Sequence, residues 1–318
     1  MNARTRPGVP WRRALLVVIA ASGLALGAAT AAAEPGHPSA VRAATGAKAV
    51  RAPAVNACDP TASSLRPSGP PQVTPGSFMA KIRARGYLIA GVDQSTYHFG
   101  FLNPLSGQIE GFDIDMIRAV AKAIFGDPGK VQFKAISDAQ RSPDTANGTV
   151  DIVAHTMTIT CDRLKLIDFS SVYFEAHQKV LVLKNSNATS LDDLHGQKVC
   201  ATYGSDSVDR IRQHHAVAVE VLYWTDCLVR LQQGSVAAIS TDDSILDGLA
   251  AQDPWTKIIG KPLTDEPYGL AISKQHPEFV RFVNAVLQQL RTDGQWKASY
   301  KAWLGNPVPN PPPAHYAG

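Results

Sequence analysis

Four hydroxyl side chains and one arginine lie close together in the middle of the chain, within the stretch 156–170. The hydroxyls belong to Thr156, Thr158, Thr160 and Ser170, and the arginine is Arg163. A guanidinium presents a planar fork of donors that matches a carboxylate, and threonine hydroxyls add neutral donors beside it. This set of side chains is suited to binding a carboxylate. The alternative is a surface loop in which the arginine pairs with a neighbouring aspartate.

A buried strand is expected directly before this stretch. The run Val150-Asp-Ile-Val-Ala154 is short and mostly apolar, which is typical of a strand inside an α/β sheet. Ligands of open α/β sheets bind beyond the carboxyl ends of the strands. Thr156, Thr158 and Arg163 are therefore predicted to lie at a strand end where a ligand can bind.

A second predicted strand ends at a glycine turn. The run 198–202 is followed by Gly204, Ser205 and Asp206, and a helix is expected after them. The amide groups at a helix N-terminus favour an anion. Capping of the helix by the serine is the alternative.

Two more predicted strands deliver polar or aromatic residues. The run 87–92 leads to Asp93, and the loop after it carries Phe99. The run 236–241 leads to Asp242, which could hold a ligand cation.

A predicted helix after Gly111 carries two acidic residues in its first turn. Asp113 and Asp115 invite a metal or catalytic interpretation. Capping explains them more simply, because a helix N-terminus favours negative charge.

The N-terminus has the pattern of a secretory signal. Residues 1–33 contain a basic start, an apolar run and small residues up to Ala33, which predicts a signal peptide. A retained anchor helix is the alternative, and Arg12-Arg13 permits twin-arginine export. No cysteine precedes Cys58, so a lipid-anchored cysteine after the signal is not expected. We predict a protein that works outside the cytoplasmic membrane.

Two segments are expected to lie outside the folded part. Residues 34–76 are rich in Ala, Pro, Ser and Gly and predict an unstructured tether, and residues 308–318 form a proline-rich tail. The net charge is +4 and no basic run follows the signal, so a nucleic-acid partner is not expected.

Four cysteines in an exported chain suggest two disulfides. Three pairings are possible. We favour Cys200 with Cys227 and Cys58 with Cys161, the second of which would fix the end of the tether beside Arg163. Free thiols are the alternative. No Cys/His spacing typical of a metal site occurs, so no metal is expected.

The segment Thr158-Ile-Thr-Cys-Asp-Arg163 with Ile167-Asp-Phe-Ser170 resembles a motif of the polar amino-acid-binding proteins that serve bacterial ABC importers. Further segments resemble other motifs of that family in the same order: 111–116, 203–208, 236–242, 266–273 and 293–305. The resemblance implies the two-lobed α/β fold of type II periplasmic binding proteins, with mostly parallel sheets, flanking helices and two crossing strands. Lobe one would comprise 77–177 and 270–307, and lobe two 178–269.

The resemblance also implies a set of ligand contacts. Thr156, Thr158, Arg163 and Ser205 would hold the α-carboxylate of an amino acid. Asp242 would bind its α-ammonium group.

Four more residues are candidates for contacts with the ligand. Asp93, Phe99 and Arg141 would contact the ligand's side chain. If Arg141 faces the ligand, glutamate and aspartate are favoured, and if it points away, glutamine and asparagine are. Asp206 departs from the family pattern. Its negative charge would repel a ligand carboxylate unless the side chain points away or contacts the ligand's ammonium group.

The predicted function is capture of a free polar amino acid (Glu, Asp, Gln or Asn) for the membrane subunits of an ABC importer, without a cofactor. One alternative is a sensor that reports to a membrane signalling protein. Another is an exported enzyme on the same fold, such as a dehydratase of cyclic acids, for which only Asp93, His155 and Asp206 could act as acid or base.

Overall fold

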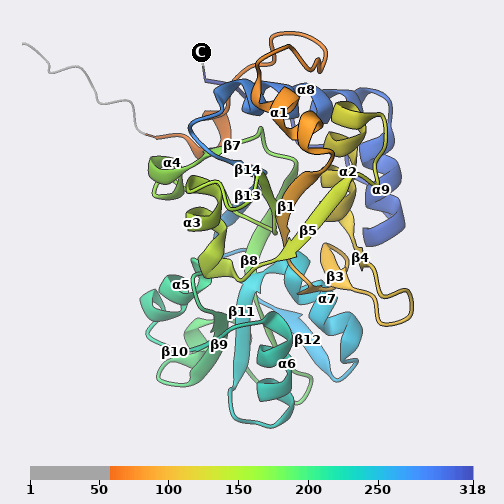
Figure 1. Cartoon of the computed structure of the whole chain (residues 1–318). Helices are drawn as coiled ribbons and strands as arrows, with labels where there is room; N and C mark the ends of the chain where they lie inside the picture. The colour runs from red at the N-terminus through yellow and green to blue at the C-terminus, as the bar shows by residue number, and fades with distance from the viewer. Residues whose placement is uncertain (1–57, 318) are drawn as a thin grey trace, which may run out of the picture. The chain divides into compact units, whose positions relative to one another are not determined.

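The structure is a computed structural model that describes residues 58–317. Two open sheets, each with flanking helices, make up most of it (Figure 1). We call the first sheet with its helices lobe one and the second lobe two. Within the described residues, no helix is long and apolar enough to cross a membrane. The predicted signal peptide and the first part of the predicted tether lie outside the described residues.

Lobe one is built on a five-stranded sheet with the order β5-β1-β6-β14-β7. Its strands are β1 (Leu88–Val92), β5 (Val131–Ala135), β6 (Ile152–Ala154), β7 (Asp168–Phe169) and β14 (Ala271–Ile272). β1 pairs in parallel with β5 and β6, whereas β14 enters antiparallel between β6 and β7. The parallel strands place Asp93 and the residues after β6 at the same edge of the sheet.

The helices of lobe one cover both faces of its sheet. They are α1 (Phe78–Arg85), α2 (Phe112–Phe125), α3 (Arg141–Ala146), α4 (Arg163–Leu166), α8 (Pro277–Thr292) and α9 (Gln295–Leu304). The apolar residues of α1, α2 and α8 share one buried core with those of β1. A smaller core on the other face contains Met157, Ile159 and Phe169.

Lobe two is built on a second sheet, with the order β10-β9-β11-β8-β12 and with β13 beside β8. Its strands are β8 (Phe174–Leu183), β9 (Lys198–Thr202), β10 (Val217–Val221), β11 (Ala238–Asp242), β12 (Thr256–Ile259) and β13 (Asp265–Tyr268). Its helices are α5 (Ser207–Gln213), α6 (Trp224–Gln232) and α7 (Asp243–Gln252). β9, β10 and β11 run parallel, so Thr202 and Asp242 end at one edge.

The strands β8 and β13 connect the lobes. The first half of β8 pairs antiparallel with β13, and its second half pairs with β11 and β12. A small sheet of β2 (Ser95–Thr96), β3 (Gly100–Leu102) and β4 (Ile109–Glu110) follows β1. It reaches lobe two, since a Cβ on Gly248 of α7 would lie 2.7 Å from the carbonyl oxygen of Tyr97.

The prediction of an unstructured tether is wrong for residues 58–76. Asn284 of α8 donates to Ser64 Oγ and to the Leu65 carbonyl, each at 2.7 Å, and Ser64 donates to the Phe169 carbonyl at 2.7 Å. The C-terminal tail joins the same surface, because the Ala317 amide donates to the Ser64 carbonyl. These partners lie more than 100 positions away in the sequence, so composition could not reveal them.

Both predicted disulfides are confirmed. Cys200 and Cys227 join β9 to α6 inside the core of lobe two, with Cα atoms 5.5 Å apart. Cys58 and Cys161 join the start of the described chain to the loop before Arg163, with Cα atoms 6.0 Å apart.

Candidate functional site

The carboxyl-end edges of the two sheets meet at one junction. Arg163 Nη2 of lobe one lies 3.4 Å from Asp206 Oδ1 of lobe two. The Thr202 hydroxyl at the end of β9 donates to the carboxylate of Asp138, which belongs to lobe one. Gly204 is also at the junction, where a Cβ would lie 2.6 Å from the Ala139 Cα atom. The glycine is therefore required for this approach, and its φ of +86° also favours glycine.

Thr156 has an unusual backbone conformation for a residue with a side chain, with a φ of 42°. Its amide donates to Asp113 Oδ2 at 2.8 Å, and the same carboxylate accepts the Tyr173 hydroxyl at 2.6 Å. Thr156 Oγ1 is buried and has no hydrogen-bond partner among the described residues. A buried hydroxyl without a partner is costly, so this atom is suited to a polar ligand.

Asp113 therefore has a different role from the one predicted. No side chain caps the N-terminus of α2, and Asp113 instead holds Thr156. Asp115 accepts hydrogen bonds from Ser299 and Trp303 of α9. Burial raises the pKa of Asp113 to about 6, although the hydrogen bonds from Tyr173 and Thr156 act in the opposite direction.

Arg163 is held at the first position of α4. Its Nη1 donates to the Thr158 carbonyl at 2.7 Å, which leaves Nη2 facing Asp206. Burial opposes ionisation of Asp206, but Arg163 and Arg141 outweigh it and lower its pKa. The guanidinium is thus oriented by its own lobe and meets an anion of the other lobe.

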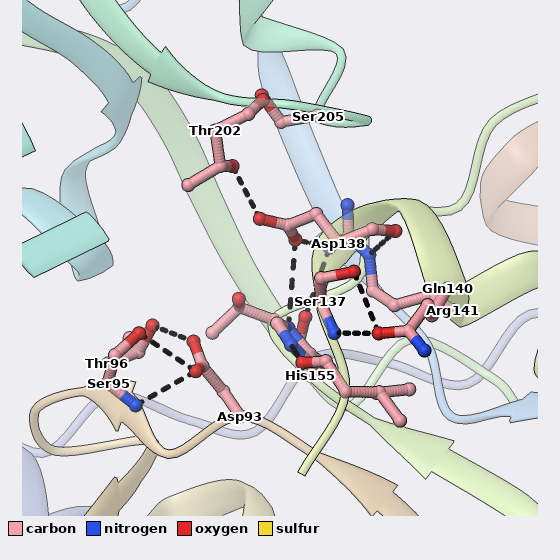
Figure 2. Close-up of polar contacts among 12 residues, drawn as sticks. Asp93, Ser95, Thr96, Ser137, Asp138, Gln140, Arg141, His155, Thr202 and Ser205 are labelled. Atoms are coloured by element: carbon pink, nitrogen blue, oxygen red, sulfur yellow. Dashed lines mark hydrogen bonds and ion pairs between the residues drawn. The ribbon is translucent and has the colours of Figure 1, made fainter. Parts of the chain in front are cut away.

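Arg141 faces inward and belongs to a buried network with Asp138 and His155, which Figure 2 shows. Its Nη1 lies 2.8 Å from Asp138 Oδ1 and donates to the His155 carbonyl at 3.2 Å. Its Nε donates to the Asp138 carbonyl at 3.1 Å. Burial lowers the pKa of Arg141, and among the charges that act on it are Asp138, Arg163, Asp206 and Asp242. Arg141 is therefore near the other charged residues of the junction.

Three carboxylates gather on the side of lobe two and the crossing strands. Burial, followed by Glu266 and Asp206, raises the pKa of Asp242 well above its ordinary value. Asp242 also accepts the Tyr268 hydroxyl at 2.5 Å. Burial and Asp206 raise the pKa of Glu266, against hydrogen bonds from Thr264 and Thr158. A ligand cation at this place would relieve the repulsion among the carboxylates.

Three predicted contact residues are engaged elsewhere in this structure. Asp93 accepts hydrogen bonds from the amides of Gln94 and Ser95 and from two hydroxyls of its own loop. Figure 2 shows its contacts with Ser95 and Thr96. Phe99 is fully buried among aromatic rings of lobe one. Ser205 donates to the Thr202 carbonyl at 2.8 Å. Their contact with a ligand stays a prediction.

Three residues at the junction were missed as site residues: Asp113, Asp138 and Glu266. Asp138 lies three residues before the predicted Arg141 in the chain, so sequence proximity was the available signal. Glu266 lies two residues before the tyrosine of the return strand. Among residues 58–317, no group of His, Cys, Asp and Glu side chains is arranged to hold a metal ion.

Comparison with known proteins assigns the family. Residues 88–306 match the bacterial extracellular solute-binding proteins, family 3. The chain belongs to this family. The resemblance found in the motifs is thereby confirmed.

Relatives and solved structures agree with this assignment. The ABC transporter glutamine-binding protein GlnH of Bacillus subtilis (strain 168) is 41% identical over 229 residues, which are 71% of this chain and 84% of that protein. The glutamate/aspartate import solute-binding protein of Salmonella typhimurium (strain LT2) is 26% identical over 247 residues, covering 74% of this chain and 82% of that protein. A solved structure of an ancestral arginine-binding protein bound to glutamine has a TM-score of 0.66 at 33% identity, and the match covers 70% of this chain and 99% of that one.

These matches confirm the predicted fold class, a two-lobed type II periplasmic-binding-protein fold. The relatives are binding proteins rather than enzymes. The family is one of extracellular proteins, which agrees with a site of action outside the cytoplasm.

Proposed function

We propose that this solute-binding protein captures a free polar amino acid between its two lobes and delivers it to the membrane subunits of an ABC importer. The glutamine- and glutamate-binding relatives support the ligand class. The predicted signal peptide at 1–33 would export the chain, and the absence of a cysteine before Cys58 argues against a lipid anchor after that signal.

One observation carries the proposal: the junction separates charge in the way that a zwitterion requires. Arg163 supplies a fixed guanidinium with Nη2 available to an anion. Asp242 and Glu266 supply carboxylates that repel one another. The α-carboxylate would replace Asp206 at Arg163, and the α-ammonium would lie among the carboxylates.

Hydroxyl groups complete this arrangement. Thr156 Oγ1 would donate to the α-carboxylate, because it is buried and has no partner among residues 58–317. Thr158 and Ser205 would add donors from the two lobes. Binding would then hold the lobes together, and the membrane subunits would recognise the closed form.

Titration calorimetry with the purified chain against the twenty standard amino acids tests the proposal. We expect binding of at least one of Gln, Asn, Glu and Asp, and weaker or no binding of leucine and phenylalanine. Failure of all four polar amino acids to bind would contradict it. Incubation with any bound amino acid should return it unchanged, whereas turnover would favour an enzyme.

A further inference from the structure

Asp138 contacts three different parts of the junction. Its Oδ1 pairs with Arg141 Nη1 at 2.8 Å and lies 3.7 Å from His155 Nδ1. Its Oδ2 accepts the Thr202 hydroxyl from lobe two. Its side chain is 3% exposed, so water does not take over these contacts. This carboxylate therefore lies in lobe one where lobe two closes on it (Figure 2).

The charge of Arg141 is already compensated inside lobe one. Its partner Asp138 is three residues away in the chain, and the two backbone carbonyls that it contacts belong to the same lobe. Opening of the lobes separates none of these groups. A ligand carboxylate that approaches Arg141 would thus meet a second carboxylate at the same guanidinium.

His155 packs against the same carboxylate. Its Nε2 lies 3.0 Å from the Ile136 carbonyl, which can only accept, and its Nδ1 lies 3.7 Å from Asp138 Oδ1. Nδ1 is buried and has no hydrogen-bond partner among the described residues.

From these contacts we propose that Asp138 is a specificity-determining residue, which neutralises Arg141 and makes the site select a carboxamide amino acid over the corresponding acid. Glutamine or asparagine is bound in preference to glutamate or aspartate. This inference rests on the proposed function and names the ligand class within it.

The first test uses the unmodified chain and calorimetry with glutamine, asparagine, glutamate and aspartate. Because a buried like charge rejects the acid, we expect the better amide to bind roughly 100-fold more tightly than its acid. Equal or tighter binding of the acid would overturn the role of Asp138 while leaving the proposed function intact. Binding of none of the four would instead contradict the proposed function.

The second test changes the charge without changing the shape. Asp138→Asn keeps an oxygen for Arg141 and places an NH2 group at the Thr202 hydroxyl, which can accept from it, but leaves the guanidinium uncompensated. Glutamate affinity should therefore rise at least about tenfold relative to glutamine affinity. The double variant Asp138→Asn/Arg141→Gln removes both charges and should restore the amide preference. An unchanged ratio in Asp138→Asn would overturn the proposal.

Thr202→Val is the matched control. It removes the hydrogen bond between the lobes but no charge. We expect it to weaken the binding of glutamine and of glutamate by similar factors. The ratio of the two affinities should therefore stay within about threefold of the parent's ratio. If this variant shifts the ratio as strongly as Asp138→Asn does, lobe closure rather than charge sets the selectivity, and the proposal is overturned.

Discussion

The surroundings of Arg141 and Arg163 differ in where the partner of each arginine comes from. Asp138, the partner of Arg141, lies in the same lobe and three residues away. Asp206, the partner of Arg163, lies in the opposite lobe at 3.4 Å. An ion pair within one lobe persists when the lobes separate, whereas a pair across the junction is broken. Arg141 is therefore part of the lobe's structure, whereas Arg163 is free to exchange its anion.

The largest effect on the free energy of unfolding should come from breaking the ion pair between Arg141 and Asp138. Arg141→Ala leaves the buried Asp138 without its cation, which costs about 3–5 kcal/mol of unfolding free energy. Urea denaturation measures it. Arg210→Ala is the control, because the hydrogen bond from Arg210 to Gln213 is exposed, and the loss of unfolding free energy should stay within about 0.5 kcal/mol. A loss below about 1 kcal/mol for Arg141→Ala would remove the distinction between the two arginines.

Arg163→Ala should abolish amino-acid binding while leaving the folded state stable. The lost contact to the α-carboxylate removes about 3 kcal/mol or more of binding free energy, at least about 100-fold in affinity. The unfolding free energy should change by less than about 1 kcal/mol, because its partner Asp206 is not fully buried. Calorimetry and urea denaturation together test this, with the exposed Arg212→Ala as control. Near-parental affinity would refute the role of Arg163.

Asp113 holds the backbone of Thr156, and its contribution is tested by the pH dependence of stability. Its pKa is about 6 in the folded chain against 3.8 as the ordinary value, so the folded state holds the proton more tightly than the unfolded state does. Ionisation of this group therefore costs stability, from nothing below about pH 4 to about 3 kcal/mol above pH 6.

Asp113→Asn removes this cost. The unfolding free energy of the variant minus that of the parent should therefore rise by up to about 3 kcal/mol between pH 4 and pH 7. The constant loss from one missing acceptor does not affect this slope. Urea denaturation at several pH values measures it, and a difference that does not change with pH would contradict the assigned pKa.

The smallest expected effect concerns the ion pair between Arg163 and Asp206. Asp206→Asn removes the anion that competes for Arg163, so amino-acid affinity should rise by about 1 kcal/mol, roughly fivefold. Asp209→Asn is the control, because Asp209 contacts only the exposed Arg212 among the ion pairs of the described chain. Weaker binding in Asp206→Asn would show that this carboxylate holds the ligand's ammonium group instead.

The fold was predictable because local patterns agree with it. The apolar run 198–202 forms β9, and the predicted helix after Gly111 is α2, which Gly126 ends in a left-handed conformation. The presence of disulfides followed from an even number of cysteines in a chain predicted to be exported, and the pairing of Cys200 with Cys227 followed from their place in one predicted lobe. Such features depend on residues close in the chain or on simple counting.

The details of the site were less predictable, because they depend on distant partners. The aspartates of α2 fit a capping pattern, yet Asp113 bonds to residues 43 and 60 positions away. Similarly, the inward direction of Arg141 could be proposed from its position, but the contact of its partner Asp138 with Thr202, 64 positions away, could not. A sequence motif gives the residue types, and the tertiary contacts decide which of them remain available.

The position of β14 has a consequence for the order in which the chain assembles. Lobe two takes its strands from one continuous stretch, β8 to β13, and so can fold as soon as that stretch is complete. In lobe one, β7 stays apart from β6 until Ala271 pairs with Val153 and Phe169, and Ala271 lies near the end of the chain. We therefore expect lobe two to complete its sheet before lobe one does.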